Sequence, residues 1–214
     1  MTIGIIFDMD GTLLDSEKLC AKAFVQLLGP FPVSETELAK RYRGVKVSDI
    51  FTDMASRYGK DIPDQVVPLY REILNSLYET ELEVFPGVFE ALETLSSDYP
   101  ICLASNAPTE KLERLTKLTG LDRFFADRLF SAYDVRAWKP EPQLFLTAAE
   151  SMRVTPDRCF VIEDSEPGLI AAQAAGMFPL VFDPSGPTSL DCPHDFDHYD
   201  SLPDRISRLA ALMS

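Results

Sequence analysis

The sequence has no apolar run approaching the roughly 18 to 20 consecutive residues that a membrane-spanning helix needs. Its first residues predict a strand instead of the basic and then apolar pattern of a secretory leader. Positive charge is also scarce, because 20 Lys and Arg stand against 34 Asp and Glu and leave a formal net charge of −14. We therefore expect no membrane partner and no nucleic-acid partner, since both offer negative surfaces that this charge repels.

Cysteine is sparse as well. The four thiols stand far apart in the chain, at Cys20, Cys102, Cys159 and Cys192. This spacing favours reduced thiols over disulfides, so we expect a cytoplasmic protein. A content of 46% hydrophobic and 25% charged residues is typical of globular chains. The length of 214 residues suits one α/β domain with a sizeable insertion, or two small domains, and we expect a monomer.

The most informative stretch lies at the start of the chain. The apolar, largely β-branched run 3–7 predicts a buried parallel strand, and Asp8 and Asp10 follow at the end where open α/β sheets bind ligands. Alternation along an extended segment aims both carboxylates to one side, where their repulsion favours a cation, above all Mg²⁺. Gly11 permits a sharp turn and Thr12 offers a hydroxyl. The structural alternative is that both aspartates only cap the next helix.

The rest of the chain alternates strand and helix, except in one segment. Helical patterns follow one another without a strand at 17–28, from 34, at 48–58 and at 67–80, which predicts an inserted helical subdomain. We expect Ser16 to cap the first of these helices, and Ser34 with Glu37 to form a capping box at the start of the second. Later strands and helices alternate, which predicts a parallel sheet with right-handed crossovers and hence an α/β fold. The expected strands are 99–104, 128–131, 159–163 and 178–182. The expected helices are 86–95, 108–118, 141–152, a helix that follows 163–165 and ends near 175, and 203–212. The segment 183–199 is expected to be irregular.

Three later segments carry residues of the kind that a phosphate site needs. Ser105 and Asn106 follow a strand and open a helix, whose first N–H groups attract anions. Lys139 supplies a positive point charge, and Glu163 with Asp164 repeats the pattern of carboxylates at a strand end. Taken singly, each has a structural explanation as a helix cap or a solvated surface residue.

The order of these groups resembles the haloacid dehalogenase-like hydrolase superfamily. Asp-x-Asp-x-Thr at 8–12, a strand ending in Ser105, Lys139-Pro140 and a strand ending in Glu163-Asp164 match its four motifs in sequence. The resemblance covers nearly the whole chain. It implies a Rossmann-like parallel sheet core, here 1–15 and 82–214, with an inserted α-helical cap at 16–81.

The resemblance also implies a role for each motif residue. Asp8 is expected to be the nucleophile and Asp10 the general acid and base. The phosphoryl oxygens are expected to be bound by Thr12, Ser105, Asn106 and Lys139. The expected Mg²⁺ ligands are Asp8, Asp10 through its main-chain carbonyl, and Asp164, with Glu163 either a direct ligand or a group behind them.

In the expected cap, Arg43, Gly44 and Lys46 form a basic cluster within an acidic protein. A solvated helix end is the structural alternative, whereas the resemblance favours a substrate-specificity loop. Glu17, just after the first crossing into the cap, is a further expected substrate contact. The cluster and the run 129–140 are most similar to bacterial 6-phosphogluconate phosphatases.

The expected function is that of a Mg²⁺-dependent phosphatase acting on small phosphorylated metabolites, such as sugar or sugar-acid phosphates, through an aspartyl-phosphate. A β-phosphoglucomutase-like mutase is the nearest alternative, but such mutases carry His where this chain has Cys20. An alternative from another class is a phosphoacceptor signalling module. Such modules place their acceptor Asp on a middle strand and lack a cap.

Overall fold

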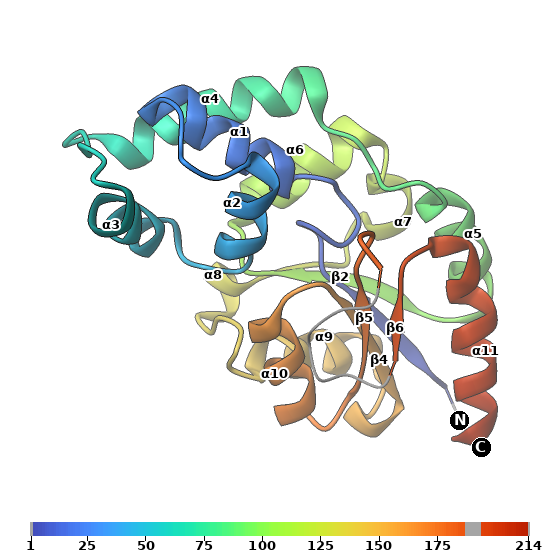
Figure 1. Cartoon of the computed structure of the whole chain (residues 1–214). Helices are drawn as coiled ribbons and strands as arrows, with labels where there is room; N and C mark the ends of the chain where they lie inside the picture. Colours follow the sequence, from blue (N-terminus) through green and yellow to red (C-terminus); the bar gives the residue numbers. More distant parts are fainter. Residues whose placement is uncertain (1, 187–193, 214) are drawn as a thin grey trace. The chain divides into compact units, whose positions relative to one another are not determined.

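The computed structural model describes residues 2–186 and 194–213 (Figure 1). Packing of the chain divides it into two compact units. The sheet unit comprises Met1–Leu14 and Val84–Ser214, and the helical unit comprises Asp15–Glu83. That the helical unit works as a cap stays a prediction.

Within the described residues, six strands form one parallel sheet in the order β3-β2-β1-β4-β5-β6. This order is that of a Rossmann-type sheet, and the direction of winding reverses between β1 and β4, where such sheets bind their ligands. The predicted α/β, Rossmann-like fold class is confirmed. The strands are β1 Gly4–Phe7, β2 Ile101–Ser105, β3 Leu129–Ser131, β4 Cys159–Glu163, β5 Phe178–Phe182 and β6 Asp195–Phe196.

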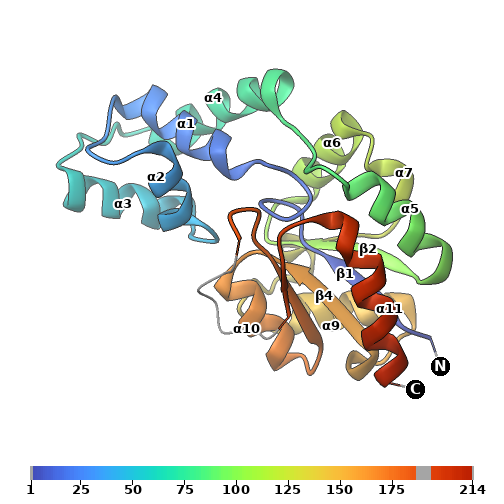
Figure 2. The same ribbon diagram turned by 45° about the vertical axis from the view of Figure 1, so that its right-hand side comes forward.

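Helices cover both faces of this sheet (Figures 1 and 2). On one face, α9 (Gln143–Met152) and α10 (Glu166–Ala174) pack on the central strands. On the other face lie α5 (Val88–Asp98), α7 (Asp122–Phe125) and α11 (Leu202–Leu212), with α6 (Thr109–Thr119) beside α7 and β3. The central strands are therefore buried on both sides, which explains why they are continuously apolar.

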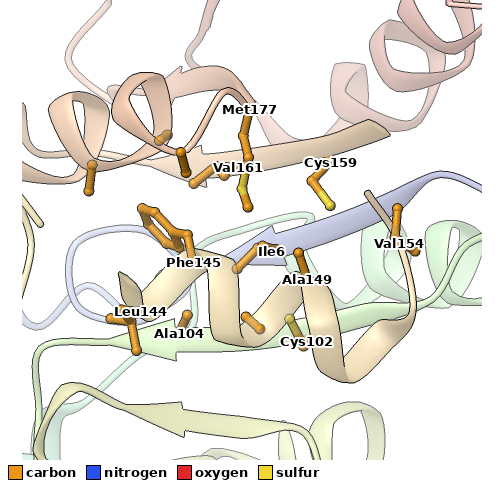
Figure 3. Packing of buried hydrophobic residues seen from close by; sticks show 14 of the residues in the cluster. Ile6, Cys102, Ala104, Leu144, Phe145, Ala149, Val154, Cys159, Val161 and Met177 are labelled. Carbon is orange, nitrogen blue, oxygen red and sulfur yellow. The ribbon is translucent and has the colours of Figure 1, made fainter. Parts of the chain in front are cut away.

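The packing under α9 and α10 shows how strand alternation builds the core. Ile6, Cys102 and Val161 all point to this face, where they meet Phe145 and Ala149 of α9 (Figure 3). The intervening residues point to the opposite face, where Phe7 meets Phe125 of α7 edge-on, with ring centroids 6.1 Å apart. Burial from both faces fixes the strand register, and with it the positions of the residues that follow each strand.

The helical unit has an aromatic core of its own. Phe24 stacks on Tyr70 with ring centroids 4.6 Å apart and meets Phe51 edge-on at 5.6 Å. The predicted capping box is confirmed, because Ser34 and Glu37 exchange hydrogen bonds at the start of α2. The helices are α1 Glu17–Leu28, α2 Glu35–Tyr42, α3 Val47–Tyr58 and α4 Val66–Glu81.

Some local predictions are wrong. The segment 183–199, expected to be irregular, contains β6 and the start of the 3₁₀ turn η2 (Tyr199–Ser201). Three short elements were not predicted from the sequence: α7, α8 (Ala132–Val135) and the 3₁₀ turn η1 (Pro156–Arg158). Ser16 precedes α1, but its side chain makes no capping hydrogen bond.

Two further findings concern the composition-based expectations. Within the described residues, Cys20, Cys102 and Cys159 form no disulfide, and Cys192 lies outside these residues. Burial raises the pKa of Cys159 to about 12, so this thiol stays protonated at neutral pH. No helix in the described parts of the chain is long and apolar enough to cross a membrane.

Candidate active site

The residues after β1 and β4 meet at the carboxyl end of the sheet, beside the point where its winding reverses. Phe7 and Ile162 are paired in the ladder, and the Asp8 amide donates to the Ile162 carbonyl at 3.0 Å. Asp8 and Glu163 therefore leave adjacent strands at the same level. Both are buried, with 7% and 1% of their surface exposed.

Lys139 joins these two carboxylates. Its Nζ lies 2.5 Å from Asp8 Oδ1 and 2.7 Å from Glu163 Oε1, and it donates a third hydrogen bond to the Ala104 carbonyl at 2.9 Å. An ammonium group has three donors, so this set satisfies it completely. Because the side chain is also buried, the charge of Lys139 is fixed in place between β1, β2 and β4.

Burial and the attraction between Asp8 and Lys139 shift the pKa values of these two residues in opposite directions. Burial raises the pKa of Asp8 to about 7; Lys139 opposes the rise, while Glu163 and Asp10 add to it. Burial alone would lower the pKa of Lys139, but Asp8 and Glu163 raise it above its ordinary value. The site therefore holds a cation firmly and places more negative charge around Asp8 than Lys139 neutralises.

Glu163 has its second oxygen engaged as well. Oε2 accepts hydrogen bonds from the Asp164 amide at 2.9 Å, the Ser165 amide at 2.9 Å and the Ser165 hydroxyl at 2.8 Å. The Ser165 hydroxyl in turn caps α10 by accepting from the Gly168 amide. Glu163 thus ties Lys139 to the start of α10.

Asp164 lies against the turn that follows Asp10. Its Oδ1 accepts a hydrogen bond from the Thr12 hydroxyl at 3.1 Å, and both groups are buried. Gly11 has a φ of +79°, and a Cβ at this position would overlap the Asp164 carboxylate. The glycine is therefore required twice, for its backbone conformation and for the close approach of Asp164.

The expected phosphate ligands after β2 have specific partners. The Asn106 side chain accepts from the Lys139 amide at 2.9 Å and donates to the Lys139 carbonyl at 3.3 Å, so it fixes the loop that carries Lys139. The Ser105 hydroxyl accepts from the Ala107 amide at 3.2 Å at the start of the turn into α6. The sheet unit thus brings the expected motif residues to one edge.

A family model described as haloacid dehalogenase-like hydrolase matches residues 4–176 of the chain. This stretch contains all four motifs. The chain belongs to the haloacid dehalogenase-like hydrolase family.

Curated relatives narrow the activity of this hydrolase. It is 33% identical over 176 residues to the 6-phosphogluconate phosphatase of Escherichia coli, covering 81% of this chain and 79% of the relative. It is also 33% identical over 177 residues to a phosphorylated carbohydrates phosphatase of Thermotoga maritima, covering 81% of each. The protein is a phosphatase, and the resemblance to 6-phosphogluconate phosphatases is confirmed. Because the protein is a phosphatase, the alternative of a phosphoacceptor signalling module is rejected.

A solved structure agrees with the fold of the whole chain. A haloacid dehalogenase-like protein of unknown function from Agrobacterium tumefaciens superposes with a TM-score of 0.89 at 30% identity. The match covers 98% of this chain and 100% of that one, so it includes both the sheet unit and the helical unit.

The hydrolase also has a site residue that the sequence analysis missed. Lys111 of α6 places its Nζ 2.7 Å from Oδ2 of Asp10, and both side chains are about three-quarters buried. A lysine near the start of an amphipathic helix is usually a surface residue, so Lys111 could not be recognised as a site residue from its local pattern. A weak signal was its place at a helix N-terminus, where cations are disfavoured.

The remaining predicted residues belong to the helical unit. Glu17 is the first residue of α1, and Arg43, Gly44 and Lys46 lie in the connection between α2 and α3. Lys46 is exposed at the N-cap position of α3, and Gly44 has a φ of +71°. Their contact with substrate stays a prediction.

The donor set of the sheet edge fits a hard divalent cation. Among residues 2–186 and 194–213, no three His, Cys, Asp or Glu side chains form a ready metal cluster. The expected ligand set needs only two side chains, Asp8 and Asp164, with the main-chain carbonyl of Asp10. Oxygen ligands of this kind, completed by water, are those that Mg²⁺ takes. The space that Gly11 leaves open for the Asp164 carboxylate fits this set.

Proposed function

We propose that this hydrolase is a Mg²⁺-dependent phosphatase of small sugar or sugar-acid phosphates that works through an aspartyl-phosphate on Asp8. The observation that carries the proposal is the Asp8–Lys139–Glu163 arrangement. It combines a buried carboxylate nucleophile with a fixed positive charge at the ligand-binding edge of the sheet. Phosphoryl transfer needs mainly such positioning and charge neutralisation.

The first step transfers the phosphoryl group to Asp8. A carboxylate oxygen of Asp8 forms a bond to phosphorus, while the bond from phosphorus to the leaving sugar oxygen breaks and its electron pair stays on that oxygen. Asp10 in its acid form donates a proton to this oxygen, so the sugar leaves as a neutral alcohol. Lys139 neutralises charge on the phosphoryl oxygens in this step, and Ser105 donates a hydrogen bond to them.

The second step returns Asp8 to its free form. Asp10, now a carboxylate, takes a proton from a water molecule whose oxygen attacks phosphorus. The bond between phosphorus and the Asp8 oxygen breaks, its electron pair returns to the carboxylate, and inorganic phosphate leaves. Covalent catalysis of this kind divides one difficult displacement into two easier ones.

Asp8, Asp164 and the Asp10 carbonyl would hold Mg²⁺, which when bound neutralises negative charge on the phosphoryl group. Of the two expected places for Glu163, a direct metal ligand or a group behind the ligands, we assign it the second. Both of its oxygens are engaged by Lys139, Ser165 and the Asp164 amide. It positions Lys139 instead.

The substrate class is supported by the relatives and by the helical unit. The matched relatives are named for 6-phosphogluconate and for phosphorylated carbohydrates. Arg43 and Lys46 are cations that fit the carboxylate or hydroxyl end of such substrates. A mutase is disfavoured because Cys20, which cannot supply the imidazole cation, stands where mutases carry His.

A phosphate-release screen over several dozen phosphorylated metabolites, with Mg²⁺ and with EDTA, tests the proposal. We expect sugar and sugar-acid phosphates to be hydrolysed over many turnovers with Mg²⁺ only. Isomeric sugar phosphates formed without release of phosphate would show a mutase instead. Undiminished release in excess EDTA would contradict the metal requirement. The Asp8→Asn variant, assayed alongside, should release no phosphate.

A further inference from the structure

The two aspartates of the first motif each pair with a different lysine. Asp8 pairs with Lys139, whose side chain is 3% exposed. Asp10 pairs with Lys111, which is 101 residues away in the chain and 28% exposed. The family motifs include Lys139 but do not explain Lys111.

The place of Lys111 in its helix is unfavourable for the helix itself. It is the third residue of α6, in the first turn, where its amide still bonds to the Pro108 carbonyl. The N-terminus of a helix carries partial positive charge, so a cation there is destabilising and an anion is preferred. Stability of α6 therefore gives no reason for a lysine at this position, whereas the ion pair with Asp10 does.

The geometry suits control of the orientation of Asp10. The Lys111 ammonium group donates a hydrogen bond to Oδ2 of the Asp10 carboxylate at 2.7 Å. A partly buried charge-assisted hydrogen bond of this kind restrains the rotation of the carboxyl group. General acid–base catalysis depends on such alignment, because the group must lie within hydrogen-bond reach of the proton that it transfers.

We propose that Lys111 is a positioning residue, which holds the Asp10 carboxyl group in the orientation for proton transfer to the leaving group. The inference rests on the proposed function, in which Asp10 is the acid and base. Lys111 transfers no proton itself. We expect Lys111 to raise kcat/KM for substrates whose leaving group needs a proton, such as a sugar alkoxide. Its effect on kcat/KM should be weak for a leaving group that needs none, such as p-nitrophenolate.

The test compares kcat/KM for two substrates, because kcat/KM reports the steps up to departure of the leaving group. The substrates are p-nitrophenyl phosphate and the sugar or sugar-acid phosphate that the screen finds to be hydrolysed fastest. Lys111→Met should lower kcat/KM about tenfold for the sugar phosphate, a part of the roughly 10²- to 10⁴-fold that general acid–base catalysis supplies. For p-nitrophenyl phosphate it should stay within about twofold of wild type.

Three further variants make the assignment specific. Lys111→Arg keeps the charge and should restore most of the lost kcat/KM. Adding Lys111→Met to Asp10→Asn should cause little further loss, because a residue that acts through Asp10 has nothing left to position. Lys117→Met removes an exposed lysine from the last turn of the same helix and should leave both substrates unaffected.

Equal losses of kcat/KM for the two substrates, or full additivity with Asp10→Asn, would overturn the inference. An unchanged kcat/KM in Lys111→Met would overturn it too. Asp8→Asn, measured in the same series, shows whether such a result concerns only the role of Lys111 or the proposed phosphatase mechanism itself. If Asp8→Asn is inactive while Lys111→Met behaves as wild type, the phosphatase mechanism stands and the proposal that Lys111 positions Asp10 is wrong.

Discussion

The Glu163 carboxylate occupies the space that a side chain at Gly168 would need. A Cβ built on Gly168 overlaps the carboxyl group of Glu163, and Gly168 is buried within α10. Glycine in a helix costs roughly 1 kcal/mol relative to alanine. Glycine at position 168 is explained by this close approach, which lets the Glu163 carboxylate reach Lys139.

The first prediction follows directly. Gly168→Ala should push Glu163 away from Lys139 and lower the free energy of unfolding by about 1 to 3 kcal/mol, as overpacking does. It should also reduce kcat on the preferred substrate, since Lys139 loses one of its two anionic partners. Urea unfolding and steady-state kinetics measure the two effects. Gln173→Ala, at an exposed position in α10, is the matched control and should change neither.

A second prediction concerns the support behind the motif turn. Tyr199 donates a hydrogen bond from its hydroxyl to the Thr12 carbonyl at 2.9 Å, and both residues are buried. Its ring packs on Phe182 and Phe196, so Tyr199→Phe keeps the packing and removes only the hydroxyl. The free energy of unfolding should fall by about 1 to 3 kcal/mol, because the buried carbonyl loses its partner.

Tyr133→Phe is the control for this measurement, because Tyr133 is 48% exposed. Its free energy of unfolding should stay within about 0.5 kcal/mol of wild type. Similar changes in the two variants would mean that the buried hydrogen bond to Thr12 adds nothing measurable.

A third prediction concerns the cation. Mg²⁺ needs a tight octahedral shell, whereas Ca²⁺ takes a larger and looser one. With two carboxylates and one carbonyl in a compact buried site, activity lost in EDTA should return with Mg²⁺ and return poorly with Ca²⁺. Phosphate release after titration of each ion into the metal-free enzyme measures this. Equal recovery with both ions would contradict the proposed ligand set.

The fourth prediction concerns specificity in the helical unit. A charge-assisted hydrogen bond to a substrate carboxylate contributes about 1.5 to 3 kcal/mol. Arg43→Ala or Lys46→Ala should therefore lower kcat/KM for a sugar-acid phosphate roughly ten- to a hundredfold, and far less for p-nitrophenyl phosphate. Lys40→Ala, an exposed lysine in α2, serves as control. Equal losses on both substrates would assign Arg43 and Lys46 to folding or to motion of the helical unit.

The elements with strong local patterns could be predicted from the sequence. The bounds of β4 and β5 were predicted to the residue, and the capping box at Ser34 marked the start of α2 correctly. The missed elements are short. α7 and α8 have four residues each, too few for a helical period, and β6 has two residues that are ordered by pairing with β5.

Within the site, residue types could be predicted but their partners could not. Phosphate binding by Asn106 stays a prediction, and no sequence pattern indicated that the backbone of Lys139, 33 residues away, holds its side chain. The contact of Lys111 with Asp10 joins residues 101 apart. Such contacts depend on how α6 and the Lys139 loop pack at the sheet edge, which no local pattern encodes.

The proposed mechanism requires that Asp8 becomes phosphorylated in each turnover. The enzyme should be quenched in acid during steady-state hydrolysis of its best substrate, reduced with borohydride and digested for peptide mass analysis. An acyl phosphate on Asp8 is reduced to homoserine, so we expect homoserine at position 8 only when substrate is present, and none in Asp8→Asn. Continued phosphate release by Asp8→Asn, with position 8 of the wild-type enzyme never modified, would contradict the proposed mechanism.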